Sequence, residues 1–207
     1  MGMAAEQRRF FTVEEYLRLE KDSLEKHEYR DGEILAMARG TADHSLILAN
    51  VIGELRNRLK GTPCRLYESN LRVKIARKVL YAYPDTTIVC GPSQFDPQDA
   101  NKTTIINPRV IIEVLSPSTE AYDRGAKFTR YREIESFEEY VLIAQDEPSV
   151  ETFLRQADGT WSFAAFAGRD AIAKIRCLSV DLPMSEVYAG VEFVEVTGVG
   201  MIEELKS

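Results

Sequence analysis

The chain of 207 residues lacks the features that would place it in several common classes of protein. No apolar run approaches the roughly 18 to 20 residues of a membrane-spanning helix, and residues 1–10 lack the apolar core of a signal peptide. The cysteines, Cys64, Cys90 and Cys177, are odd in number and dispersed, so we expect neither a zinc site nor a disulfide. These absences predict a protein of the reducing cytoplasm that does not bind membranes.

The chain also lacks the excess of basic residues typical of a dedicated nucleic-acid binder. It has 26 Lys and Arg against 33 Asp and Glu, which gives a net charge of −7. Net charge is a weak guide, because a local basic stripe decides contact with phosphates. Basic residues do form three clusters, each of which could be such a stripe or a solvated face: Arg56, Arg58, Lys60 and Arg65; Arg72, Lys74, Arg77 and Lys78; Arg124, Lys127, Arg130 and Arg132.

No internal repeat and no linker divides the chain. We therefore predict a flexible N-terminal arm over residues 1–11, a single domain over residues 12–191 and an acidic C-terminal tail over residues 192–207. A domain of this size can bury a core of its own.

Helix signals recur along the chain. The spacing of apolar residues predicts helices over residues 13–21, 44–60 and 119–133, and a short one within 182–188. Thr12 followed by Glu15 forms a capping box, which predicts the start of the first helix. Either Thr41 or Asp43 could cap the second helix, and Thr119 could cap the third.

Apolar runs and alternating patterns predict strands over residues 33–38, 65–67, 70–75, 86–90, 110–115, 139–143, 150–154 and 161–166. The last two flank a turn and form a hairpin. Residues 70–75 alternate, which predicts one buried and one wet face. Residues 91–107 are rich in Pro, Asp, Asn and Gln, so we expect a long surface loop. The helix after residue 115 supplies the crossover that two neighbouring parallel strands require.

Two acidic residues lie in or beside the most apolar strands. Glu113 falls inside residues 110–115, and Asp85 directly precedes residues 86–90. A buried carboxylate is costly unless it is paired or binds something, so each could instead be the structural partner of an Arg or a backbone donor. Two carboxylates about 5 Å apart would repel by roughly 3 kcal/mol, and a divalent cation would remove that repulsion. Oxygen ligands favour Mg²⁺ or Mn²⁺.

Three more residues could complete a site. Lys127 could reach back over the strand ends to orient water or neutralise developing charge, or pair with Asp123 one turn away, and both roles could coexist. His44 lies at the start of its helix, where the helix dipole would lower the pKa of the imidazole and keep it neutral. A neutral imidazole could bind a metal or carry a proton, or His44 could be only a helix cap. Glu28, before a tight turn, could be a third acid or a surface residue.

Several segments carry a common pattern: FTVEEYL at residues 11–17, HEYRDGE at residues 27–33, His44, YPD at residues 83–85, and EVLSPST at residues 113–119 with Asp123, Lys127 and Tyr131. Together they resemble the Uma-type family, described as restriction endonucleases of the PD-(D/E)XK nuclease superfamily. The resemblance covers about residues 10–190.

The resemblance implies an α/β fold with a restriction-endonuclease-like core, which is a mixed central sheet flanked by helices, here with an added β-hairpin. It implies that Asp85 and Glu113 bind Mg²⁺ or Mn²⁺. It also implies that the protein hydrolyses phosphodiester bonds in nucleic acid, and we expect DNA as the substrate in preference to RNA. The superfamily pattern has Lys two residues after the acid, where this chain has Leu115, so Lys127 would stand in as the third catalytic residue.

For contact with nucleic acid we predict Arg72, Lys74 and Arg124. We also predict a homodimer, because a two-fold axis matches the pseudo-symmetry of DNA and the 150–166 hairpin offers Trp161, Phe163 and Phe166 as apolar surface. Two alternatives stay open. One is a non-catalytic nucleic-acid-binding or regulatory homodimer on a nuclease scaffold, and the other is a structural homodimer whose acids satisfy neighbouring basic groups.

Overall fold

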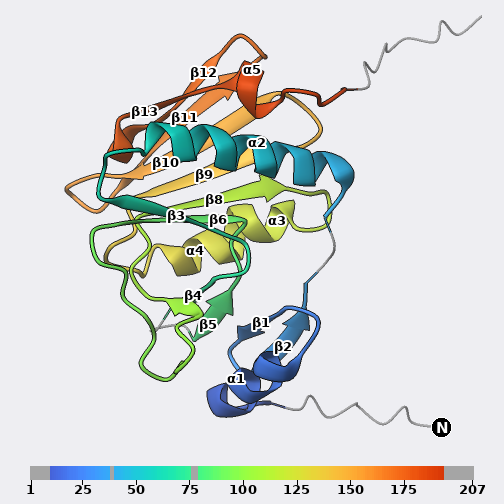
Figure 1. Ribbon diagram of the computed structural model, residues 1–207, viewed down its shortest axis with the longest axis vertical. Coiled ribbons are helices and arrows are strands. Elements are labelled where there is room, and N and C mark those ends of the chain that lie inside the picture. Colours follow the sequence, from blue (N-terminus) through green and yellow to red (C-terminus); the bar gives the residue numbers. More distant parts are fainter. Residues whose placement is uncertain (1–9, 38–39, 76–78, 194–207) are drawn as a thin grey trace, which may run out of the picture.

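The computed structural model describes residues 10–37, 40–75 and 79–193 and is built around a six-stranded sheet (Figure 1). The strand order is β11-β10-β9-β8-β6-β3, with β8 and β9 parallel and the other neighbours antiparallel. The strands are β3 (Cys64–Glu68), β6 (Thr86–Cys90), β8 (Val110–Leu115), β9 (Glu139–Ala144), β10 (Ser149–Arg155) and β11 (Trp161–Ala167). The predicted mixed sheet and its β10–β11 hairpin are confirmed.

Helix α2 (Ala42–Arg58) lies across one face of this sheet (Figure 1). It buries Ile47, Val51 and Leu55 against the strands. Of the two candidate caps, Thr41 is the residue that caps α2, because its hydroxyl accepts a hydrogen bond from the His44 backbone N–H at 3.1 Å. The capped end of α2 is thereby placed beside the carboxyl end of β8 (Figure 1).

The C-terminal part of the described chain packs against α2 and against strands β10 and β11. It consists of β12 (Ile172–Ile175), a 3₁₀ turn (Arg176–Leu178), β13 (Val180–Pro183) and the predicted short helix α5 (Met184–Val187). Of the predicted arm over residues 1–11 and tail over residues 192–207, only residues 10, 11, 192 and 193 fall within the described part. The domain bounds therefore stay a prediction.

The opposite face of the sheet is covered by the crossover between β8 and β9. The predicted helix over residues 119–133 is confirmed, since residues 120–131 are helical without a break: α3 (Glu120–Tyr122), a π-helical turn (Asp123–Lys127) and α4 (Phe128–Tyr131). Thr119 occupies the predicted N-cap position, but its hydroxyl contacts Ser116 Oγ at 3.0 Å and makes no capping hydrogen bond. The wider π turn directs Asp123 and Lys127 inward, and such turns are frequent at functional sites.

A second sheet has the order β2-β1-β5-β4-β7. Its strands are β1 (His27–Arg30), β2 (Glu33–Ala36), β4 (Arg72–Ile75), β5 (Leu80–Ala82) and β7 (Thr104–Ile105). Helix α1 (Val13–Asp22) begins with the predicted capping box and packs Tyr16 against Tyr29 and Tyr81. We call residues 10–37, with α1, β1 and β2, the N-terminal lobe (Figure 1). The predicted strand over residues 33–38 ends at Ala36, and residue 38 lies outside the described part.

The predicted wet face of β4 is wrong at Arg72, which is only 5 % exposed. Its guanidinium pairs with Asp99 at 3.0 Å, and Lys74 pairs with Asp96 at 2.9 Å. Both acids belong to residues 91–107, which were predicted to be a surface loop. This segment instead folds back on β4 and buries the two carboxylates, which neutralise the cations of β4.

The prediction that no disulfide forms was wrong. Cys64 on β3 and Cys90 on β6 occupy directly opposed positions of an antiparallel pair and form a disulfide, whereas Cys177 is free. Sequence spacing missed this pair because the strand register, not a motif, brings it together. Within the described ranges, no helix has the length and apolar character to cross a membrane. The disulfide removes the cysteine argument for a reducing cytoplasm, and the cytoplasmic location stays a prediction.

Candidate functional site

The candidate site is a pocket of about 850 Å³ between the N-terminal lobe, the start of α2 and the carboxyl end of β8. It is lined by all of the predicted catalytic and metal-binding residues and by the two possible additional ones, which come from five separate parts of the chain: Glu28, His44, Asp85, Glu113 and Lys127. The fold therefore gathers them around one space.

Asp85 and Glu113 lie side by side because β6 and β8 are paired. The backbone N–H of Asp85 donates to Glu113 Oε2 at 3.2 Å, and the backbone N–H of Val114 donates to Asp85 Oδ2 at 2.8 Å. Each carboxylate is thus oriented by the backbone next to the other. This is the arrangement that the apolar runs predicted, and the metal-binding role of the two acids stays a prediction.

Lys127 lies at the centre of the acids. Its Nζ is 2.8 Å from Glu113 Oε1, 3.1 Å from Asp123 Oδ1 and 3.6 Å from Glu28 Oε1. The site-facing role and the pair with Asp123 therefore occur together. Burial by itself would lower the pKa of Lys127, but the Glu113 carboxylate and the other nearby acids raise it well above its usual value, so the amine is charged.

The pKa of the Glu113 carboxyl is raised from its usual range toward neutral pH. Burial is the main cause that raises its pKa, Lys127 acts against it, and Asp123 and Asp85 add to it. The resulting pKa is about 8. Tyr131 donates its hydroxyl to Glu113 Oε1 at 3.2 Å. Glu113 can therefore exchange a proton for another cation near physiological pH.

Leu115 explains why the lysine comes from the helix. It lies two residues after Glu113 on the same face of β8, where it packs with Tyr131 and Tyr140 under the crossover. Leu115, which occupies the position where the superfamily pattern has Lys, is therefore part of the core. The π turn above this face delivers Lys127 to the same carboxylate.

The expected pKa shift of His44 was wrong in sign. Its Nε2 lies 3.2 Å from Asp85 Oδ2, and this hydrogen bond raises the pKa of the imidazole more than burial lowers it. A carboxylate at hydrogen-bond distance outweighs the dipole of the helix end. Glu28 is only 7 % exposed and accepts from the Tyr122 hydroxyl at 3.3 Å, so it belongs to the site and not to the surface.

Tyr122 is the site residue that sequence reasoning missed. Its ring lies 5.5 Å from the Arg30 guanidinium and 5.9 Å from Lys127 Nζ. No spacing singled it out, because the π turn shifts the positions that a regular helix would present. Asp123 and Tyr131, by contrast, carry a signal in their spacing of four from Lys127.

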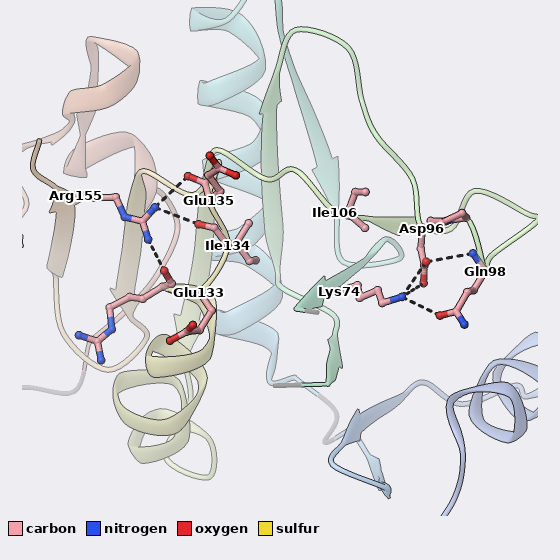
Figure 2. Close-up of a pocket in the computed structure, with 10 residues that line it drawn as sticks. Lys74, Asp96, Gln98, Ile106, Glu133, Ile134, Glu135 and Arg155 are labelled. Carbon is pink, nitrogen blue, oxygen red and sulfur yellow. Dashed lines mark hydrogen bonds and ion pairs between the residues drawn. The ribbon is translucent and has the colours of Figure 1, made fainter. Parts of the chain in front are cut away.

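The three residues predicted to contact nucleic acid differ in burial and in their ion-pair partners. Burial and the pair with Asp99 remove Arg72 from any surface, so that prediction is wrong. Figure 2 shows Lys74 bonded to Asp96 and Gln98 in a second pocket, with Arg155 on its other side. Arg124 is partly exposed and pairs with Glu120 and Glu151. Its role in nucleic-acid contact stays a prediction.

The site carries more negative than positive charge. Glu28, Glu113 and Asp123 surround Lys127, and Asp85 pairs with His44. Within the described ranges no three His, Cys, Asp or Glu side chains converge as a ready metal centre. Two carboxylates fit a cation that keeps most of its waters, as Mg²⁺ does, because such an ion needs only one or two protein acids.

A family model described as "Uma2: Putative restriction endonuclease" matches residues 13–185 of the chain. The chain belongs to the Uma2 family. Two Synechocystis relatives, the uncharacterized proteins slr1290 and sll1609, are 34% and 31% identical to it. The first match covers 87% of this chain and 92% of the relative, and the second covers 79% and 91%. The resemblance found in the sequence is confirmed.

A crystal structure from Anabaena variabilis, described as a "putative nuclease belonging to DUF820", matches the fold with a TM-score of 0.69. It shares 18% identity and covers 86% of this chain and 97% of that chain. The predicted fold class is therefore confirmed. Membership of the Uma2 family supports a nuclease function.

Proposed function

We propose that this protein is a Mg²⁺-dependent endonuclease that hydrolyses phosphodiester bonds in DNA. The observation that carries the proposal is the charge of the pocket. Four carboxylates line the pocket, three of them around one buried ammonium and the fourth beside one imidazole, and two of the four lie side by side where β6 and β8 pair. A divalent cation would balance that charge.

The residues divide the chemistry among them. Asp85 and Glu113 would hold the cation, which supplies a bound water of lowered pKa and polarises a phosphoryl oxygen. Lys127, kept charged by the acids around it, would neutralise charge that develops on the phosphoryl oxygens. His44 orients Asp85 through their hydrogen bond and, with its raised pKa, could protonate the leaving oxygen.

We also propose that the protein acts as a cytoplasmic homodimer. Strand β11 forms the edge of the large sheet, and Phe163 on it is 57 % exposed. Two copies related by a two-fold axis would bring two sites to the two strands of a duplex. Of the predicted basic contacts, Arg124 remains in this proposal.

The experiment compares cleavage of DNA and RNA by the wild type, Asp85→Asn and Glu113→Gln in Mg²⁺ or Mn²⁺. We expect each variant to lose at least about 10³-fold in rate, because one cation ligand is gone. Asp181→Asn is the matched control, since Asp181 is an exposed acid paired with Lys174. Equal cleavage by all four proteins would mean contamination and would refute the proposal.

A second candidate function is a non-catalytic nucleic-acid-binding protein on the same scaffold. It is favoured by Leu115, which occupies the position of the superfamily lysine. Metal binding by isothermal titration and DNA binding without cleavage by the wild type would select it.

A further inference from the structure

We propose that the pocket contains an apolar subsite for an unstacked nucleobase beside the scissile phosphodiester, with Leu24 as the wedge that separates bases. The proposal rests on the proposed function in one respect only, that nucleic acid enters this pocket. It adds a substrate class, mismatched or locally unpaired DNA, and a residue that selects for it.

Leu24 lies at the pocket, in a turn between α1 and β1 that is held by two hydrogen bonds. Its side chain is 104 % exposed, yet the residue lines the same pocket as the acids. The hydroxyl of Ser23 donates to the Glu25 carbonyl at 2.7 Å and accepts from the Glu25 N–H at 3.1 Å. These two bonds hold the turn closed, so the leucine projects from a braced loop.

The segment that begins at Leu24 lines the pocket with side chains of different chemistry. Leu24, Glu25 and Lys26 precede β1, and Glu28 and Arg30 lie within it, where positions two apart share a face. Lys26 is anchored by a bond from its Nζ to the Ser69 carbonyl at 3.0 Å, and Arg30 lies over the Tyr122 ring. Cations on both sides of Glu28 suit the phosphates that flank a cleaved bond.

Further apolar side chains lie around the same pocket: Leu35, Met37, Leu48 and Pro117. A nucleic-acid backbone presents phosphates and sugars, which need polar partners. Apolar side chains in the same pocket as carboxylates and cations instead suit the flat face of a base. Leu, Met and Pro are the side chains that proteins insert between base steps.

Insertion of Leu24 into a paired duplex would cost a few kcal/mol of unstacking. The cost is smaller for a mismatched or single-stranded segment. We therefore expect the protein to bind and cleave a duplex that is mismatched or locally unpaired in preference to a perfect duplex, so that two copies can still meet its two strands.

The test measures binding without cleavage, with Ca²⁺ in place of Mg²⁺. The probes are single-stranded oligonucleotides that carry 2-aminopurine at one position each, whose fluorescence rises when the base is unstacked. We expect the wild type to raise the signal at one position. Leu24→Ala should abolish that rise and weaken binding on the order of tenfold, the loss for an exposed Leu that is buried on binding. Leu19→Ala is the control, because Leu19 is an exposed leucine of the same lobe that does not line the pocket.

Equal binding and fluorescence for the wild type and Leu24→Ala would overturn the proposal, as would the same loss in Leu19→Ala. The two proposals fail separately. Cleavage without any change in 2-aminopurine fluorescence would remove the subsite alone, and a Leu24-dependent fluorescence rise without cleavage in Mg²⁺ would remove the nuclease alone.

Discussion

Two pockets of about 850 Å³ each hold ionised groups in this protein, and they differ in how those charges are balanced. In the pocket beside β4, Lys74 pairs with Asp96 (Figure 2). The neighbouring Arg72 pairs with Asp99. In the pocket at the end of β8, Lys127 meets three carboxylates. Volume does not distinguish the two pockets, but charge balance does.

The pKa directions in the two pockets follow this difference. Burial alone would raise the pKa of Asp96 and Asp99, but bonds from Lys74 and Tyr81 to the first, and from Thr103, Thr104 and Arg72 to the second, lower both. In the site, burial and neighbouring acids raise the pKa of Glu113 to about 8. Acids held permanently charged fix the fold, whereas an acid that titrates near neutral pH can exchange its proton for a ligand.

The largest expected effect comes from breaking a balanced pair. Arg72→Met should lower the free energy of unfolding by about 3 to 5 kcal/mol, because Asp99 keeps a buried charge without its cation. Urea denaturation measures the loss. Lys174→Met, which breaks an exposed pair with Asp181, is the control and should change stability by less than about 1 kcal/mol. Similar stability of the two variants would contradict the structural role of Arg72.

Next in size is removal of the cation from the unbalanced pocket. Lys127→Met should slow cleavage about 100-fold, which is about 2.7 kcal/mol, while metal still binds. The variant should also melt at a lower temperature than the wild type without metal, since three acids lose their common partner. Mg²⁺ should raise the melting temperature of the variant more than that of the wild type. An unchanged cleavage rate would exclude a catalytic role for Lys127.

The pH dependence of stability should separate the two pockets. Because the pKa of Glu113 is raised from its usual 4.5 to about 8, the folded state binds an extra proton between these values. Its contribution to stability is complete below pH about 4.5 and is lost as pH rises through about 8, by up to about 1.4 kcal/mol per pH unit. Denaturation of the metal-free protein at several pH values measures this slope.

Glu113→Gln should flatten the slope, because the amide does not titrate. The lowered pKa values of Asp96 and Asp99 act in the opposite sense: their contribution is present at neutral pH and is lost as pH falls. A slope that persists in Glu113→Gln would assign it to another group.

The smallest expected effect concerns nucleic-acid binding. Arg124→Ala should weaken DNA binding several-fold for every sequence and reduce the salt slope by about one, because one phosphate contact is lost. Lys74→Ala should leave both unchanged, since the Lys74 side chain is only 17% exposed, against 36% for Arg124. Fluorescence anisotropy at several salt concentrations measures both variants, and equal losses would contradict the division between them.

Local signals in the sequence determined much of this protein. Thr12 and Glu15 encode the start of α1 within one turn, and the β10–β11 hairpin follows from its turn and alternation. The apolar runs around Asp85 and Glu113 were enough to predict that these acids would meet. Such signals work because a cap, a turn or a buried strand is specified by residues that are neighbours in the chain.

Only the tertiary structure decided which distant groups became partners. The pairs Arg72–Asp99, His44–Asp85 and Cys64–Cys90 join residues that are far apart in sequence, and each depends on strand register and helix placement. The π turn that aims Lys127 at Glu113 is likewise set by packing over the sheet. These partners decide which charges are balanced, because a charge inside a protein is stabilised by what the fold places beside it.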